Sequence, residues 1–472
     1  MSIHAVWSEQ EFGHAALGDE RRSHRARHMA ATMSRSPGGQ LCAVFADAAA
    51  REAAYRFVRN DAIAWEALSR SASAATVERC LQQPLVFVPI DATSLNLRDP
   101  DGRRGMGTIG THGVGAQGLH VMTAIAVDGR GVPVGTCGQR FWARTERVGL
   151  GRDDYDPRSV EQKETRYWLE VLKDVQAGFA TSPRGTRPFF QLDRGGDAWP
   201  ILTHAVDEGL LLTTRATHNR RVGKKKYLWP TVAAVEPQGS YALQVPEGPN
   251  RTARRAVVQL QFRAVELDVK ERRSGLRRKL AMWAVRVFEV DTAPRGEERI
   301  EWMLLTTCPV HTIDDALFVV RGYTTRWRIE EFHKTLKSGA CNLEDSMLHR
   351  RENVQRFAVL SSSVAIHLQR LLHLSRTSPD EPATALLTRH EIDATILLRK
   401  PAGVSVGETP SISAVVRWIA DLGGFMGPAQ ATIRKASAGG QSIRQPGAII
   451  LRRGLERILP VATLLSDGSL RL

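Results

Sequence analysis

A cluster of ionisable residues at helical spacing surrounds position 330. The stretch 321–337 has no Pro, has no Gly after Gly322, and repeats apolar residues at Ile329, Phe332 and Leu336, so the sequence predicts a helix. At roughly 100° per residue, one arc of about 60° on this helix holds four polar residues. They are Tyr323, Arg326, Glu330 and Lys337. A carboxylate among such neighbours can hold a metal ion while the cations and the phenol bind phosphate oxygens.

The same face also has a plainer interpretation. Charged residues three or four positions apart pair with one another on many solvated helices. Glu330 therefore needs acidic partners from other elements before a catalytic role follows.

Two further carboxylates accompany apolar strands. Residues 85–90 predict a strand that delivers Asp91 at its end and continues into 92–95, and residues 188–192 predict a short buried strand that ends at Asp193. Sheets of the α/β class present ligands at the carboxyl ends of their strands. An isolated Asp in this position is also a common helix cap or turn residue.

Three carboxylates from three separate elements, Asp91, Asp193 and Glu330, would repel one another if they met. Divalent cations would neutralise them, and hard oxygen ligands favour magnesium or manganese. Two such ions could activate a water or a 3′ hydroxyl and stabilise the leaving oxygen in an in-line displacement at phosphorus. The sequence thus points to nuclease or strand-transfer chemistry.

The remaining pattern predicts the elements that must position these acids. Residues 1–70 are mostly helical in pattern, with Asp19 as an N-cap and a basic helix face. That face holds Arg21, Arg22 and Arg25. Apolar runs at 120–127 and 132–135 flank a turn and predict a hairpin, and 159–180 predicts a helix. Between about 210 and 306 alternating strands predict an antiparallel β insertion. A long apolar helix near 354–374 and terminal helices near 411–422 and 449–459 complete the pattern.

Composition limits the class of protein. The chain has 472 residues and a formal net charge of +15, with basic residues spread from end to end, which favours two or three domains and a long nucleic-acid footprint. Its five cysteines are widely spaced without a Cys-x-x-Cys pair, as expected of reduced thiols in a cytoplasmic protein. No signal-like N-terminus and no run of about 18 apolar residues occurs, so we expect no membrane partner.

These motifs resemble those of a known family. The spacing Tyr323, Arg326, Glu330, Lys337 matches the Tyr-(2)-Arg-(3)-Glu-(6)-Lys signature of the bacterial cut-and-paste DDE transposases of the insertion sequence four group. Residues 91–94 look like the family's first-Asp strand and 193–197 like its second-Asp motif. The resemblance extends from Ala16–Asp19 to Leu422–Met426. The turn after Asp193 departs from the pattern, because Gly195 and Gly196 stand where the family commonly has Glu and Ala, and this predicts a looser turn.

The resemblance implies an architecture and a set of partners. It implies a ribonuclease-H-like catalytic domain over 71–378, interrupted by the antiparallel β insertion at about 210–306. Helical domains would flank it, a DNA-binding one at 1–70 and a dimerisation one at 379–472. The protein would act as a homodimer on double-stranded DNA, both transposon ends and target, in the bacterial cytoplasm.

The resemblance also implies residue roles. Asp91, Asp193 and Glu330 would be the catalytic acids and would bind two Mg²⁺ ions per active site, with Mn²⁺ as a substitute. Tyr323, Arg326, Lys337 and Arg215 would hold phosphates. Trp302 matches the family tryptophan that receives a flipped base during hairpin formation, although a tryptophan in a β core would look the same in sequence.

Two other functions stay open at this point. A ribonuclease-H-like nuclease could cut DNA without joining it. A non-catalytic end-binding regulator could keep the fold and the basic surface while lacking cleavage. Metal-dependent cleavage of DNA that carries the element ends would separate these alternatives from a transposase.

Overall fold

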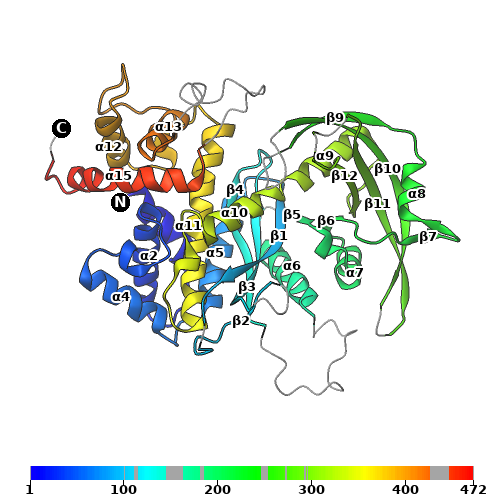
Figure 1. Ribbon diagram of the computed structural model, residues 1–472, viewed down its shortest axis with the longest axis horizontal. Helices are drawn as coiled ribbons and strands as arrows, with labels where there is room; N and C mark the ends of the chain where they lie inside the picture. The colour runs from blue at the N-terminus through cyan, green and yellow to red at the C-terminus, as the bar shows by residue number, and fades with distance from the viewer. Residues whose placement is uncertain are drawn as a thin grey trace.

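The computed structural model describes residues 2–99, 101–110, 115–144, 163–180, 185–245, 254–271, 274–291, 294, 296–425 and 446–470. Helices gather at one end of the molecule, and a long twisted sheet extends toward the other (Figure 1). The class is mixed α/β with a helical N-terminus, as the sequence pattern predicted. In the described ranges no helix is long and apolar enough to cross a membrane.

Helices of the N-terminal part come first in the chain. They are α1 (Ile3–Phe12), α2 (Glu20–Arg35), α3 (Leu41–Val44), α4 (Ala48–Arg59) and α5 (Trp65–Cys80). Asp19 caps α2 as predicted, because its side chain accepts a hydrogen bond of 2.8 Å from the Arg21 backbone N–H. The basic residues Arg22 and Arg25 are half-buried, whereas Arg21 is exposed.

The described residues contribute twelve strands to one sheet. They are β1 (Leu85–Asn96), β2 (Gly107–Thr108), β3 (Gln117–Val127), β4 (Pro133–Trp142), β5 (Arg187–Leu192), β6 (Leu211–Arg215), β7 (Arg221–Gly223), β8 (Lys226–Tyr227), β9 (Gly239–Val245), β10 (Arg254–Lys270), β11 (Arg277–Glu289) and β12 (Glu301–Thr306). The path runs β2-β3-β1-β5-β6-β12-β11-β10-β7-β8, with β4 paired to β3 and β9 paired to β10.

The remaining helices cover the sheet or follow it. They are α6 (Thr165–Ala180), α7 (Trp199–Asp207), α8 (Leu228–Ala233), α9 (Ile313–Thr324), α10 (Trp327–Lys337), α11 (Arg351–Thr377), α12 (Arg389–Arg399), α13 (Ile412–Leu422) and α15 (Ala448–Ser466). The described ranges also contain three short 3-10 turns, η1 (Arg194–Gly196), η2 (Leu343–Asp345) and η3 (Ala383–Ala385).

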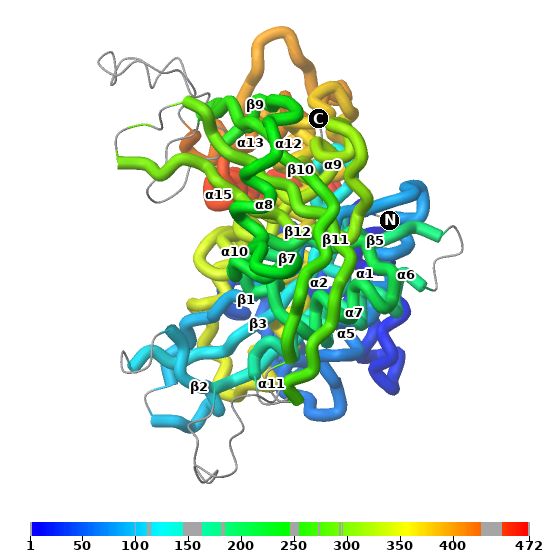
Figure 2. The backbone as a smooth tube through the Cα atoms, turned by 90° about the vertical axis from the view of Figure 1, so that its right-hand side faces the viewer, coloured from blue at the N-terminus to red at the C-terminus, as the bar shows by residue number. Residues whose placement is uncertain are grey.

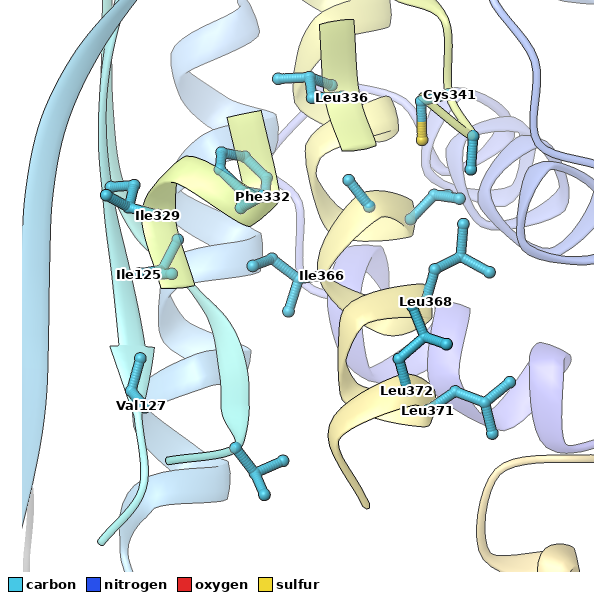
Figure 3. Close-up of a cluster of buried hydrophobic side chains, with 14 of the residues drawn as sticks. Ile125, Val127, Ile329, Phe332, Leu336, Cys341, Ile366, Leu368, Leu371 and Leu372 are labelled. Carbon is cyan, nitrogen blue, oxygen red and sulfur yellow. The ribbon is translucent and has the colours of Figure 1, made fainter. Parts of the chain in front are cut away.

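One helix forms the centre of the packing. The run 353–369 of α11 is buried on all sides, and its buried polar residues such as Arg356 and Ser363 form hydrogen bonds with neighbouring elements. It packs against α2, α4, α5, α10, α13 and β4. Figure 3 shows Phe332 and Ile329 of α10 between β3 and α11, where Ile366 meets them. The predicted core positions of α10 are therefore confirmed.

The hairpin around the turn at 128–131 is also confirmed, since β3 and β4 pair antiparallel. The strand 188–192 and the helix 354–374 are likewise present as β5 and α11. Residues 145–162, which include the predicted start of the helix at 159–180, lie outside the described ranges, as does Met426.

The predicted continuous helix over 321–337 is wrong. The chain turns at Thr325 and Arg326 between α9 and α10, where backbone hydrogen bonds run to the third preceding residue. The hydroxyl of Thr325 donates to the Gly322 carbonyl at 2.6 Å, and that of Thr324 donates to the Arg321 carbonyl at 2.7 Å. Such side-chain bonds compete with the helical pattern and tighten it locally.

The predicted β insertion needs a second correction. Most of its strands are antiparallel, but β6 pairs in parallel with β5, and β12 pairs antiparallel to β6. The strands from 211 to 306 therefore continue the same sheet that carries β1 and β5. Sequence alternation indicates strands but does not reveal which neighbour each strand pairs with.

Candidate active site

Two acids lie side by side because of strand register. Strands β1 and β5 are parallel, and their pairing ends with Ile90 opposite Leu192. Both of these side chains are buried in the layer that contains α6 and α7 residues. Because successive side chains alternate between the faces of a sheet, Asp91 and Asp193 project to the other face, where α10 packs.

Local hydrogen bonds fix the backbone around each acid. The Asp193 carboxylate accepts the Gly195 N–H at 2.7 Å and caps η1, and its carbonyl accepts the Thr214 hydroxyl at 2.7 Å. Asp91 lies inside β1, past the end of its pairing with β5, and its carboxylate accepts the Ala92 N–H at 2.8 Å. Both acids are thus held by regular structure and not by a loose loop.

The turn between α9 and α10 places an arginine among the acids. Arg326 Nη1 lies 3.5 Å from Asp91 Oδ2, and its Nη2 lies 2.6 Å from Glu330 Oε1. The Nε of Arg326 is buried without a hydrogen-bond partner among the described residues. Arg326 therefore forms a bridge between Asp91 and Glu330, two of the three predicted acids.

In the described part of the chain, no group of three or more His, Cys, Asp or Glu side chains is arranged to hold a metal ion. The charges of Asp193 and Glu330 nevertheless act on the Asp91 carboxyl. Burial, together with the negative charges of Asp193 and Glu330, raises the pKa of Asp91 to about 7, although Arg326 and the Ala92 N–H oppose the rise. A carboxyl group in this setting holds its proton unless positive charge is supplied.

The phenol of Tyr323 closes the site from the α9 side. Its side chain is buried, and burial raises its pKa, while the nearby positive charges of Arg326 and Arg215 lower it. Arg215 ends β6 and donates from Nη2 to the Glu301 carbonyl at 2.9 Å. The predicted phosphate contacts Tyr323, Arg326 and Arg215 therefore lie around the same acids.

Lys337, at the end of α10, contacts β1 at Thr93, two residues after Asp91. Its Nζ is 3.3 Å from Thr93 Oγ1 and 3.7 Å from Glu344 Oε1. Glu344, on η2, also accepts the Asn96 N–H at 2.8 Å and so ties the end of β1 to the segment after α10. The sequence analysis missed Glu344, because only the fold brings η2 against β1.

Trp302 belongs to an aromatic cluster beside the acids. It is 7% exposed on β12, and its ring meets those of Tyr323 and Trp327 edge-on, at centroid distances of 5.3 and 6.0 Å. In this structure the ring is therefore part of the core, next to the site.

The turn after Asp193 is packed closely, contrary to the expectation that its two glycines loosen it. A Cβ on Gly196 would lie 2.5 Å from the Leu192 Cβ, and one on Gly195 would lie 3.0 Å from the Trp168 ring. Asp197, which follows, is buried and bound to Arg220 Nη2 at 2.6 Å. Glycine is needed here because the turn has no room for a side chain.

The basic N-terminal residues lie apart from the acids. Arg21, Arg22 and Arg25 belong to α2, which packs against α1, α4 and α11. Figure 1 shows α2 on the opposite side of α11 from β1 and β5. Arg22 donates to the Leu17 carbonyl at 2.8 Å, so part of this basic face supports its own segment.

A comparison with known families bears on this N-terminal part. Residues 4–63 match the family model described as transposase DNA-binding. The matched range covers α1 to α4 and includes all three basic residues of α2. The match supports a transposase that binds DNA through its N-terminal helices.

Proposed function

We propose that this protein is a cut-and-paste DNA transposase of the DDE type, similar to the insertion sequence four group. The observation that carries the proposal is that buried Asp91 lies close enough to Asp193 and Glu330 for both negative charges to raise its pKa, in a chain whose N-terminus matches a transposase DNA-binding family. It would bind transposon ends, cut them by phosphoryl transfer through a hairpin intermediate, and join the 3′ hydroxyl ends to target DNA.

The sheet order supports a ribonuclease-H-like catalytic domain. Strands β4, β3 and β1 form an antiparallel meander, and β5 and β6 then join parallel to β1. Helix α6 connects β4 to β5, and α7 connects β5 to β6. In this arrangement the acids lie at the carboxyl ends of parallel strands, where α/β sheets commonly bind ligands.

The donor set fits a divalent cation. Burial and the negative charges of Asp193 and Glu330 raise the pKa of Asp91 to about 7, against the opposing effects of Arg326 and the Ala92 N–H. Asp91, Asp193 and Glu330 would hold the Mg²⁺ ions, and Mn²⁺ would substitute. When bound, the ions would supply Lewis-acid stabilisation of the attacking and leaving oxygens.

The neighbouring side chains have roles that follow from their positions. Release of Glu330 from Arg326 would free both a carboxylate and a guanidinium, and the latter can hold a DNA phosphate by two parallel hydrogen bonds. Lys337 and Arg215 add positive charge on either side, and the Tyr323 hydroxyl can donate to a phosphate oxygen.

The same proposal includes a stacking role for Trp302 and a homodimer that holds two DNA ends. A flipped base would have to enter the cluster of Trp302, Tyr323 and Trp327 by displacing their edge-on contacts. A dimer would involve the C-terminal helices after residue 379.

The decisive experiment is cleavage of a supercoiled plasmid that carries the native element ends, with Mg²⁺ present. The wild type should release the element through hairpin-ended products. Glu330→Gln should bind the ends normally and lose cleavage by at least a hundredfold, since it removes one acid of the set. Glu456→Gln is the matched control, because Glu456 lies on α15 and, within the described ranges, pairs with Arg452 of its own helix.

Each other outcome points elsewhere. Cleavage that survives Glu330→Gln would remove Glu330 from the catalytic set. Cutting without joining would favour the nuclease alternative, and end binding with no cutting at any divalent ion would favour a regulator.

A further inference from the structure

A second strongly basic surface lies at the far end of the sheet from the N-terminal helices. It is made by the β7–β8 hairpin and the start of α8 and consists of Arg221, Lys224, Lys225, Lys226, Tyr227 and Trp229. We call this surface the basic hairpin. In Figures 1 and 2, β7 and α8 lie on the outer surface of the sheet's end.

The alternation of side chains sends the polar groups outward. Val222 packs on the core layer, and Leu228 and Val232 are fully buried. The residues between them therefore point to solvent, and Tyr227 and Trp229 are 40% and 44% exposed. Large aromatic side chains left in water beside lysines are uncommon on a surface with no ligand.

The turn of the basic hairpin also carries an unusual backbone. Lys225 has φ +56°, in the left-handed region that non-glycine residues rarely adopt. Strained positions of this kind often occur at binding sites, where they set the direction of a side chain.

The neighbouring hairpin provides a contrast. On β10 and β11, Lys279 pairs with Glu266 at 2.6 Å and Arg278 pairs with Asp207 at 2.7 Å. The three lysines of the basic hairpin form no ion pair with any described residue. Their charge is therefore available to an anionic partner.

A chain of contacts ties the basic hairpin to the acidic site. The segment before β7 is held by Asp197, which bonds Arg220 and accepts the Thr217 N–H at 2.7 Å. Thr217 also donates from its hydroxyl to the Arg194 carbonyl at 2.9 Å, next to Asp193. The segment that leads into the basic hairpin is therefore bonded directly to the turn that carries Asp193.

We propose that the basic hairpin binds the backbone of duplex DNA without reading its sequence, as an extension of the DNA held at the acids. The lysines would neutralise phosphates, and Trp229 would pack its flat face against the DNA. The proposal rests on the proposed function for the identity of the ligand.

The test measures DNA affinity of the full-length protein by fluorescence anisotropy, with a labelled duplex that lacks the element ends, from 50 to 300 mM salt. In the variant K224A/K225A/K226A, the slope of log affinity against log salt concentration should decrease in magnitude by about two to three, because each lost phosphate contact removes about 0.9 from the slope. The control R277A/R278A/K279A removes the same charge from the neighbouring paired hairpin and should change the slope by less than one. Trp229→Ala should weaken binding without changing the slope, because Trp229 carries no charge and so neutralises no phosphate.

The outcomes separate the two proposals. Equal salt-dependence slopes for the two triple variants, with unchanged unfolding midpoints, would overturn the proposal that the basic hairpin binds DNA. That conclusion would hold even if the wild type cuts DNA. A wild type that never cuts DNA, but whose slope depends on the three lysines, would keep this surface and remove the transposase assignment. The same measurement with a labelled single strand distinguishes the two forms of DNA. If Trp229→Ala weakens binding to the single strand but not to the duplex, the partner is single-stranded DNA and the duplex proposal is wrong.

Discussion

At the scale of single residues, the Asp91 carboxyl is held protonated by burial and by its acidic neighbours. Its pKa is about 7 in the folded protein and 3.8 in the unfolded chain, so the folded state binds the extra proton between these values. Stability therefore falls as pH rises from about 4 to 7. Asp91→Asn should raise the free energy of unfolding at pH 8 by up to about 4 kcal/mol, at 1.36 kcal/mol per pH unit, and much less at pH 4.5. Urea denaturation at both pH values measures this, and an equal gain at both would contradict it.

The same residue gives a test of metal binding that does not depend on activity. If ionised Asp91, Asp193 and Glu330 bind Mn²⁺, millimolar Mn²⁺ should raise the unfolding temperature of the wild type at pH 8, because ligands that bind the folded state stabilise it. Asp193→Asn and Glu330→Gln should each reduce the rise by more than half. Differential scanning fluorimetry provides the measurement, and the Glu456→Gln variant should behave like the wild type. An equal rise in all four proteins would place the metal elsewhere.

At the scale of elements, the turn η1 fixes Asp193 through glycines that have no room for a side chain. Gly196→Ala would bring a Cβ to 2.5 Å from that of Leu192, so it should lower the free energy of unfolding by about 1–3 kcal/mol. Gly129→Ala is the control, since no atom lies within 4 Å of its Cβ position and its φ is ordinary. Chemical denaturation of both variants tests this. Equal effects would mean that η1 can relax to accept a side chain.

At the scale of the whole molecule, a buried hydrogen-bonded pair joins the N-terminal helices to the C-terminal ones. His4 Nε2 lies 2.9 Å from Glu391 Oε1, and the Ser34 hydroxyl lies 2.8 Å from the other His4 nitrogen. His4→Ala would leave Glu391 buried without its main partner, and the free energy of unfolding should fall by about 3–5 kcal/mol. Arg56→Ala, which breaks an exposed pair with Glu52, should change it little. Urea denaturation measures both variants. If His4→Ala and Arg56→Ala lower the free energy of unfolding by similar amounts, the buried pair contributes no more stability than the exposed one.

The sequence by itself determined the local features of this protein. The spacing of Ile329, Phe332 and Leu336 marked the buried side of α10, and the turn at 128–131 marked the hairpin, because side-chain periodicity and turn chemistry act over a few residues. The sequence also places the acids Asp91 and Asp193 directly after runs of apolar residues that form strands.

Only the tertiary structure decided which of these features meet. The parallel pairing of β1 with β5, the contact of Arg326 with Asp91, and the contact of Glu344 with Asn96 all join segments distant in sequence. Strand alternation alone is compatible with several partners for each strand, and helix periodicity is compatible with an unbroken helix. Register and packing select one arrangement because only that one buries the two apolar layers on both faces of the sheet.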